Sequence, residues 1–328
     1  MRTSIFTAFM KLNIRMVVSI LLILVICGCQ KSSPPQGKES GKKLSVVTTL
    51  FPLYDFARNI CKDKADVQLL LPPGVEAHSF EPKPADLITI SKADVFIYTN
   101  PAMEPWATKL LKGVAQPSLS IVDASQGAAM LTAGKSSHEE EGHAGEAHDH
   151  DGGVDPHLWL DFKNAAIMVD NMVAAISAKD SANADFYKSK ATAYKAELHK
   201  LDADFSTGLT NCGKRTFLHG GHYAFGYLAN RYGLTYRSAQ AVNPDAEPTP
   251  STIAELLKLV KANGLKYVYA EELVSPRIAD MIAKETGVKI LMLHGAHNIS
   301  KDDLAGGSTF IGLMRKNLES LRVGLLCK

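Results

Sequence analysis

Short β-rich runs alternate with helical segments over residues 44–125, and this alternation is the strongest constraint on the fold. The first run reads LSVVTTL, and apolar residues at helical spacing follow it. Parallel strands need a crossover between them, so this alternation predicts a parallel sheet with right-handed connections. The strands expected here are 44–50, 67–71, 94–98 and 118–122, with helices over 51–62, 84–92 and 105–112.

The alternation stops after residue 125 and returns near residue 215. Two helical segments, 164–178 and 183–208, lie in between without a strand, and the second has apolar residues at helical spacing. A long helix between two α/β halves indicates a connecting strut. The second half is expected to hold strands at 215–218, 235–237, 267–270 and 289–293 and helices over 223–232, 251–262, 276–286 and 309–326, with Ser251 as an N-cap.

We therefore expect an α/β protein of two (β/α) lobes with parallel sheets, joined by a long connecting α-helix. The length of 328 residues agrees, because it exceeds what one compact core usually holds. The expected divisions are an N-terminal lobe at 44–160, connecting helices at 161–210 and a C-terminal lobe at 211–328. Two such lobes leave a cleft, and ligands of open α/β sheets bind at the carboxyl ends of strands.

The N-terminus predicts export and lipidation. Three basic residues precede an apolar run at 16–26, which is too short to span a bilayer of about 30 Å, so residues 1–28 are interpreted as a signal peptide rather than a short membrane anchor. The run Ile26-Cys27-Gly28-Cys29 resembles a bacterial lipobox, which makes Cys29 the expected lipidation site. Residues 29–43, rich in Ser, Pro, Gly and Lys, are then expected to be a flexible tether.

The charge balance argues against one class of partner. The formal net charge is +2, but three basic residues and no acidic ones lie within the predicted signal peptide. Without that peptide, 33 basic residues face 34 acidic ones. A basic surface built for nucleic acid is therefore not expected.

Cysteine use follows from the processing of the N-terminus. With Cys27 removed and Cys29 lipidated, the chain keeps Cys61, Cys212 and Cys327. In an oxidising compartment we expect a disulfide between Cys212 and Cys327, since both fall in the same half of the chain. The alternative is that all three thiols stay free.

Four of the eleven histidines are concentrated in a loop at 136–152, among six acidic residues. No Lys or Arg occurs between Lys135 and Lys163. Imidazoles and carboxylates mixed in this way offer many weak, exchangeable ligands to a borderline divalent ion, so we expect a weak metal-collecting loop. The alternative is a plain solvated acidic loop. The four histidines are His138, His143, His148 and His150.

Three other histidines stand at junctions between expected elements. His78 follows a strand of the first half, His157 precedes the connecting helices, and His222 follows a strand of the second half. They could converge on one cleft, where neutral imidazole nitrogen is a natural ligand for Zn²⁺. Asp155 or Asp161 could orient the rings from behind. Spacing alone does not establish this site.

Three sequence motifs support this metal site through a resemblance to a known family. The runs PGVEAHSFEP at 73–82, DPHLWLD at 155–161, and HYAFGY at 222–227 with RYGL at 231–234 look like the metal-binding solute receptors of ABC transporters, the ZnuA- and TroA-like cluster A-I family. The resemblance covers roughly residues 44–326. It implies two lobes joined by a rigid helix and one buried metal between them. The ligands that it implies are His78, His157 and His222.

The resemblance also bears on the metal and its fourth ligand. Manganese receptors of the family tend to place a carboxylate where His222 stands, so histidine here favours Zn²⁺, with Mn²⁺ or iron as the alternative. Many members have Leu-Asp-Pro after the late strand, with the Asp as a ligand. This chain departs from that pattern: His294 aligns best with the Asp, His297 is the next candidate, and water or Glu76 is the remaining choice. Glu76 or Glu271 could offset the metal charge.

The function implied is a lipid-anchored receptor on the periplasmic or extracellular face of the membrane that delivers Zn²⁺ to an ABC permease for import. We expect a monomer that is not an enzyme. The chain lacks a Walker-type loop, so the ATPase would be a separate subunit. A metal-dependent adhesin of the same fold is an alternative. A zinc hydrolase is a weaker one, since the sequence has neither HExxH nor a nucleophile elbow.

Overall fold

The computed structural model describes residues 42–111, 117–133, 153–242, 247–273 and 275–328, and residues 43–328 form one compact unit. The predicted signal peptide, nearly all of the tether and the loop at 136–152 lie outside the described residues. The same holds for the sites predicted there, which are Cys29, His138, His143, His148 and His150.

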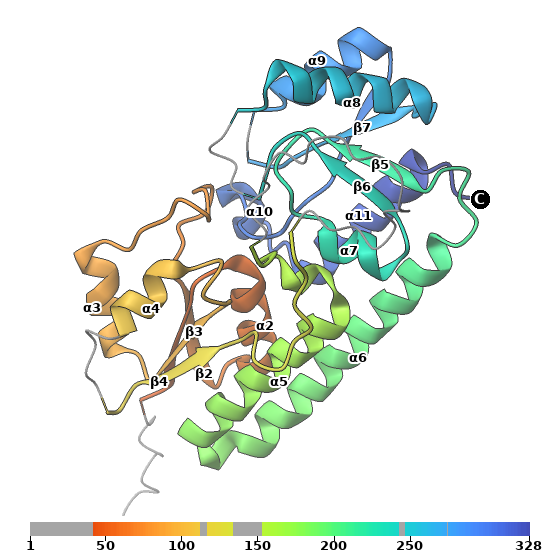
Figure 1. The fold of residues 1–328 in the computed structure, drawn as a ribbon. Helices are drawn as coiled ribbons and strands as arrows, with labels where there is room; N and C mark the ends of the chain where they lie inside the picture. The colour runs from red at the N-terminus through yellow and green to blue at the C-terminus, as the bar shows by residue number, and fades with distance from the viewer. Residues whose placement is uncertain (1–41, 112–116, 134–152, 243–246, 274) are drawn as a thin grey trace, which may run out of the picture. The chain divides into compact units, whose positions relative to one another are not determined.

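The N-terminal lobe is built on a four-stranded parallel sheet of order β2-β1-β3-β4, as the alternation predicts (Figure 1). Val46 on β1 pairs with Val67 on one side and Val95 on the other, and Val46 and Val95 put fully buried β-branched residues at the centre of the sheet. The second strand lies two residues earlier than expected. The elements are β1 Leu44–Thr48, α2 Phe51–Cys61, β2 Ala65–Leu69, α3 Pro84–Lys92, β3 Val95–Tyr98, α4 Pro105–Leu111 and β4 Ser120–Asp123.

Two long helices connect the lobes, namely α5 at Phe162–Lys179 and α6 at Ala184–Gly208 (Figure 1). A short 3₁₀ turn, η1 at Leu158–Leu160, precedes α5, and another, η2 at Ser181–Asn183, joins the two helices. The buried face of α6 carries Tyr187, Tyr194, Leu198, Leu201 and Phe205 at helical spacing. These buried residues let α6, which is otherwise mostly polar, pack against the apolar core.

The C-terminal lobe repeats the design with a second parallel sheet of order β6-β5-β7-β8. Ser251 is not the N-cap of α8: Thr249 accepts the hydrogen bond from the Thr252 amide, because the helix begins one residue earlier, at Pro250. The short α10 was not predicted. The elements are β5 Thr216–His219, α7 Gly226–Arg231, β6 Thr235–Ser238, α8 Pro250–Ala262, β7 Tyr267–Ala270, α9 Arg277–Thr286, β8 Lys289–Met292, α10 Lys301–Ala305 and α11 Phe310–Gly324.

One apolar core runs through both lobes and the connecting helices. It extends from Val46 in the first sheet through Trp159 and Phe205 to Phe310 at the start of α11. A disulfide joins Cys212 to Cys327, the pair that the sequence suggests, and so ties the chain end to the segment before β5. Among the described residues, no helix is both long enough and apolar enough to cross a membrane.

Candidate metal centre

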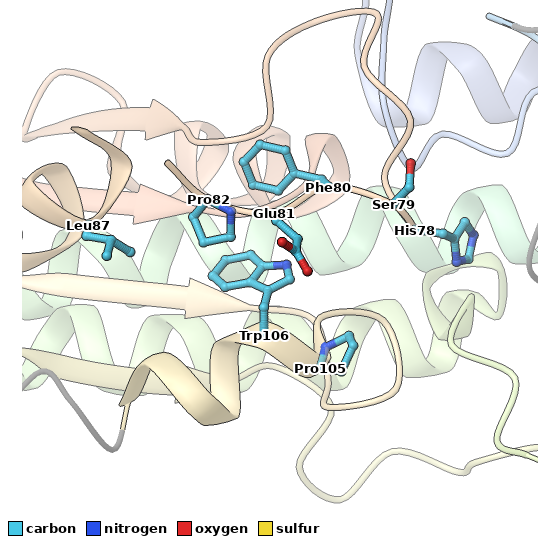
Figure 2. Close-up of a pocket in the computed structure, with 8 residues that line it drawn as sticks. All are labelled: His78, Ser79, Phe80, Glu81, Pro82, Leu87, Pro105 and Trp106. Carbon is cyan, nitrogen blue, oxygen red and sulfur yellow. The ribbon is translucent and has the colours of Figure 1, made fainter. Parts of the chain in front are cut away.

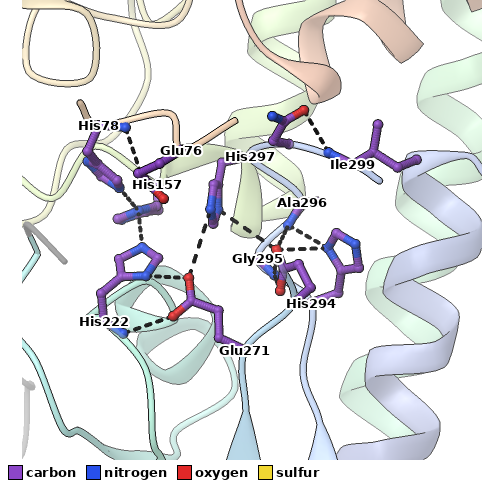
Figure 3. Close-up of polar contacts among 12 residues, drawn as sticks. Glu76, His78, His157, His222, Glu271, His294, Gly295, Ala296, His297 and Ile299 are labelled. Atoms are coloured by element: carbon purple, nitrogen blue, oxygen red, sulfur yellow. Dashed lines mark hydrogen bonds and ion pairs between the residues drawn. The ribbon is translucent and has the colours of Figure 1, made fainter. Parts of the chain in front are cut away.

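Three histidines from three separate segments bring their Nε2 atoms together (Figure 3). The Nε2 of His157 lies 3.2 Å from that of His78 and 3.2 Å from that of His222. Two nitrogens bound tetrahedrally to Zn²⁺ at about 2.0–2.1 Å stand about 3.3 Å apart. The spacing of these nitrogens therefore fits a shared zinc ion, and the structure brings together the three ligands implied by the sequence.

His157 is held in the tautomer that a metal needs. Its Nδ1 lies 2.8 Å from Oδ1 of Asp155, and the same oxygen accepts a hydrogen bond from the His157 amide at 3.0 Å. A proton kept on Nδ1 leaves the lone pair on Nε2. Complete burial, helped by the neighbouring His78 and His222, holds the pKa of His157 well below its usual value. Burial raises the pKa of Asp155 to about 7.

Asp161, the other aspartate expected behind the site, has a different role. Its carboxylate accepts from the Lys163 amide at 2.8 Å, which caps α5, and lies 3.0 Å from Arg231. Of the two aspartates offered as orienting groups, Asp155 therefore contacts a histidine of the cluster and Asp161 caps a helix instead. Asp161 stands directly before Phe162, the first residue of α5, which is the N-cap position.

His222 is oriented by Glu271 at the end of β7. The Nδ1 of His222 lies 2.6 Å from Oε1 of Glu271, and the His222 amide donates to Oε2 at 3.0 Å. A Cβ at Gly221 would lie 1.9 Å from that Oε2, so only glycine admits the carboxylate. Burial by itself lowers the pKa of His222, but Glu271 outweighs it and raises that pKa. His222 in turn lowers the pKa of Glu271 against the effect of burial.

The two candidates for the fourth position, His294 and His297, point in different directions. His294, the best-aligned candidate, turns away from the three histidines, and its Nδ1 lies 3.0 Å from Oε1 of Glu272 (Figure 3). His297 faces the cluster instead, with its ring centre 5.3 Å from that of His222 and 6.1 Å from that of His78. It is 3% exposed, and burial lowers its pKa.

The backbone explains why His297 and not His294 faces the cluster. Ala296, between them, has a φ of 61°, in the left-handed region that turns the chain sharply. A Cβ at Gly295 would lie 2.8 Å from Nδ1 of His297, so glycine makes room for that ring. Glu76 does not reach the cluster as a ligand: its Oε1 accepts from the His78 amide at 2.7 Å.

Two buried carboxylates of the C-terminal lobe, those of Glu271 and Glu272, lie next to the site. His297 stands between two buried carboxylates, with Nε2 at 3.9 Å from Glu271 and Nδ1 at 4.0 Å from Glu272. Burial opposes ionisation of Glu272, but His294 and the amide of Gly295 hold its pKa below the usual range. Two carboxylates near four neutral imidazoles can offset the +2 charge of a bound ion.

A polar network that the sequence did not reveal supports the segment before His157. Glu104 is 1% exposed and accepts hydrogen bonds from the hydroxyl of Thr49 at 2.5 Å and from the Asn100 amide at 3.1 Å. Asn100 donates its side-chain amide to the Pro156 carbonyl at 3.1 Å. Burial raises the pKa of Glu104 to about 7, against the effect of these hydrogen bonds.

His219 lies behind the site. It is fully buried, and its Nδ1 lies 3.2 Å from the His222 carbonyl. A cavity of about 360 Å³ lies next to His78, which forms one end of it (Figure 2). Trp106 and Phe80 also line this cavity and pack edge-on, with their ring centres 5.9 Å apart. His78 is the one member of the four-histidine cluster that is not fully buried. The cluster is therefore closest to solvent at His78.

The buried, nitrogen-rich cluster between the two lobes is the kind of site that holds a divalent metal ion. The family model described as zinc-uptake complex component A, periplasmic, matches residues 46–324, and the chain belongs to this family.

The chain also resembles named proteins. It is 36% identical over 93% of its length to the high-affinity zinc uptake system protein ZnuA of Bacillus subtilis and covers 95% of that protein. It is 35% identical over 96% of its length to the zinc-binding protein AdcA of Streptococcus pyogenes but spans only 62% of that longer relative. The Zn(II)-bound ZnuA-like domain of Streptococcus pneumoniae AdcA matches 86% of this chain and 99% of its own, with 32% identity and a TM-score of 0.72.

Proposed function

We propose that this protein is an extracytoplasmic zinc-binding receptor that delivers Zn²⁺ for import. The observation that carries the proposal is the spacing of the imidazole nitrogens of His78, His157 and His222 at the tetrahedral distance for zinc. Relatives named for zinc uptake and zinc binding support the same ion. The nitrogen-rich donor set favours Zn²⁺ over Mn²⁺, which prefers oxygen.

His297 is the fourth ligand in this proposal, in place of His294. It is buried beside His222, and its loop is held by Glu272 through the amides of Gly295 and Ala296. Glu271 stays on Nδ1 of His222 and contributes charge and orientation. Four protein ligands close the coordination sphere, so no open position is left for an activated water. The proposed role is therefore transport rather than catalysis.

The partners follow from this role. We propose that a separate ABC permease and its ATPase receive the ion, and that the receptor acts as a monomer on the periplasmic or extracellular face of the membrane. Lipidation of Cys29 would anchor it there, with residues 29–43 as the tether. The histidines of residues 136–152 would collect zinc weakly and pass it to the buried site.

The deciding experiment is a competition titration of the mature protein with Zn²⁺ and Mn²⁺, read by native mass spectrometry. One zinc bound per chain, retained in a large excess of manganese, is the expected result. Preferential retention of manganese or iron would overturn the choice of metal, and absence of any tightly held ion would overturn the proposed function.

The two-tier model of collection and storage has its own test. Deletion of residues 136–152 should remove the weakly bound zinc and leave the single tight ion in place. Native mass spectrometry at rising zinc concentration separates the two classes of ion. Loss of the tight ion in the deletion variant would contradict the model.

A further inference from the structure

Two loops that carry metal ligands from different lobes meet at a single buried side chain, that of Asn298. The residue follows His297 directly in the C-terminal lobe and is 0% exposed. Its side-chain amide donates to the Pro72 carbonyl at 2.9 Å and to the Val75 carbonyl at 2.5 Å. Both carbonyls belong to the N-terminal loop that leads to His78.

Asn298 uses both the nitrogen and the oxygen of its side-chain amide in hydrogen bonds. Besides the two donated hydrogen bonds, its Oδ1 accepts from the Ile299 amide at 2.8 Å. The backbone adds a third link between the loops, from the Gly74 amide to the Ile299 carbonyl at 2.9 Å. A carboxylate or an apolar side chain at this position would remove the Asn298 donor from the Val75 carbonyl and would leave the Pro72 carbonyl with only the Val75 amide, at 3.1 Å.

The link from this amide to the metal centre is short. Val75 precedes Glu76, whose carboxylate accepts from the His78 amide, and His78 then presents Nε2 to His157. On the other side, Asn298 is the neighbour of His297. The same side chain thus fixes where one N-terminal ligand and one C-terminal ligand stand relative to each other.

We propose that Asn298 is a positioning residue for the metal site: its amide fastens the His78 loop to the His297 loop and sets His78 at the distance that zinc requires. The proposal rests on the function proposed above. In this proposal Asn298, which is not itself a ligand, contributes to the zinc affinity. A ligand loop that is not already ordered must become ordered when the ion binds, and this lowers the affinity.

The chain offers a matched control in Asn171. This residue of α5 also donates its amide to two backbone carbonyls, Ala124 at 2.9 Å and Gln126 at 2.8 Å. Both acceptors lie in the segment after β4, away from the ligand loops. Asn171→Ala therefore removes the same kind of hydrogen bonds without touching the His78 loop.

The first measurement is zinc affinity, by competition with a chromophoric chelator. Asn298→Ala should weaken zinc binding by about 10- to 100-fold, the usual cost of losing a group that orients a ligand, while Asn171→Ala keeps the wild-type affinity. If the alanine variant fails to fold, Asn298→Leu serves instead, since it has a similar volume and no donor. Wild-type affinity in a folded Asn298 variant would overturn the proposal.

Two further measurements separate positioning from general stability. Bound Co²⁺ should give Asn298→Ala a visible spectrum displaced toward that of His78→Ala, whereas a merely destabilised site would keep the wild-type spectrum. In the metal-free protein, hydrogen exchange at the Gly74 and His78 amides should accelerate in Asn298→Ala and not in Asn171→Ala. Unchanged exchange would refute the fastening itself, whereas failure of the wild-type chain to bind zinc would refute only the proposed function.

Discussion

The two lobes contribute to the proposed metal centre by different means. The N-terminal lobe and the segment before α5 supply His78 and His157, whose pKa values are lowered by burial. The C-terminal lobe supplies His222 and His297 together with two buried carboxylates, Glu271 and Glu272. The N-terminal side therefore provides neutral nitrogen, and the C-terminal side also provides the negative charge that offsets a divalent ion.

The strongest test of this division removes the ligands of one side at a time. His78→Ala with His157→Ala, and separately His222→Ala with His297→Ala, should each abolish tight zinc binding, with a loss well beyond about 100-fold, because either change removes half of the nitrogens. Isothermal titration measures both. Tight binding retained by either double variant would mean that the opposite side holds the ion alone.

The two lobes also differ in whether their cysteines form a disulfide. The disulfide joins residues 115 positions apart in the C-terminal half, while Cys61 in the N-terminal lobe is free. Replacing Cys212 and Cys327 by Ser should lower the free energy of unfolding by about 4 kcal/mol, because the unfolded chain gains freedom. Urea unfolding measures the change, and reduced wild-type protein is the matched control. Equal stability of the oxidised and reduced forms would contradict the pairing.

The N-terminal lobe should respond to pH through Glu104. Its pKa is about 7 in the folded chain against 4.5 as reference, so the folded state holds its proton more tightly. The stabilisation from this group is complete below pH 4.5 and is lost as the pH rises to 7, by about 3 kcal/mol at most. In Glu104→Gln this part of the decline should vanish in urea unfolding measured across that range.

A control for Glu104 lies in the other lobe. Glu255 is an exposed acidic residue on α8, and Glu255→Gln should leave the pH dependence of unfolding as in the wild type. If Glu104→Gln and Glu255→Gln gave the same profile, the buried carboxylate would not be the source of the effect.

The smallest expected effect is on zinc affinity, when either of the two carboxylates that orient the histidines is replaced. Glu271 contacts both His222 and His297, at 2.6 and 3.9 Å, whereas Asp155 contacts the ring of His157 alone, at 2.8 Å. Glu271→Gln should therefore weaken zinc binding by about 10- to 100-fold, and Asp155→Asn by less. Chelator competition ranks them, and a larger loss for Asp155→Asn would reverse the assignment of charge to the C-terminal side.

Much of the fold was readable from local patterns. The strand at 267–270 and the long helix ending at Gly208 lie where hydrophobic periodicity places them. The errors are local: β2 is shifted by two residues, and Thr249 rather than Ser251 caps α8. Thr249 and Ser251 can both cap a helix, and the signal that selects Thr249 is Pro250, because proline is favoured at the first helical position.

The site was readable only where motifs fixed it. His78, His157 and His222 were found because each stands in a run with a family resemblance, but the choice between His294 and His297 depends on the left-handed turn at Ala296. Alanine gives no sign of such a turn in the sequence. Asn298 and Glu104 were missed for a related reason, since each pairs with a group far away in the chain, Asn298 with the Pro72 carbonyl and Glu104 with the Thr49 hydroxyl.

Trp159 adds a practical consequence. Its indole Nε1 donates to the Gly295 carbonyl at 2.8 Å, its ring lies edge-on to His157 at 5.5 Å, and it is fully buried. The chain has only one other tryptophan, Trp106 beside the cavity. The molecule thus has an intrinsic fluorophore that contacts one proposed ligand and is hydrogen-bonded to the loop of another, so a change in its emission on addition of Zn²⁺ would report binding without a label.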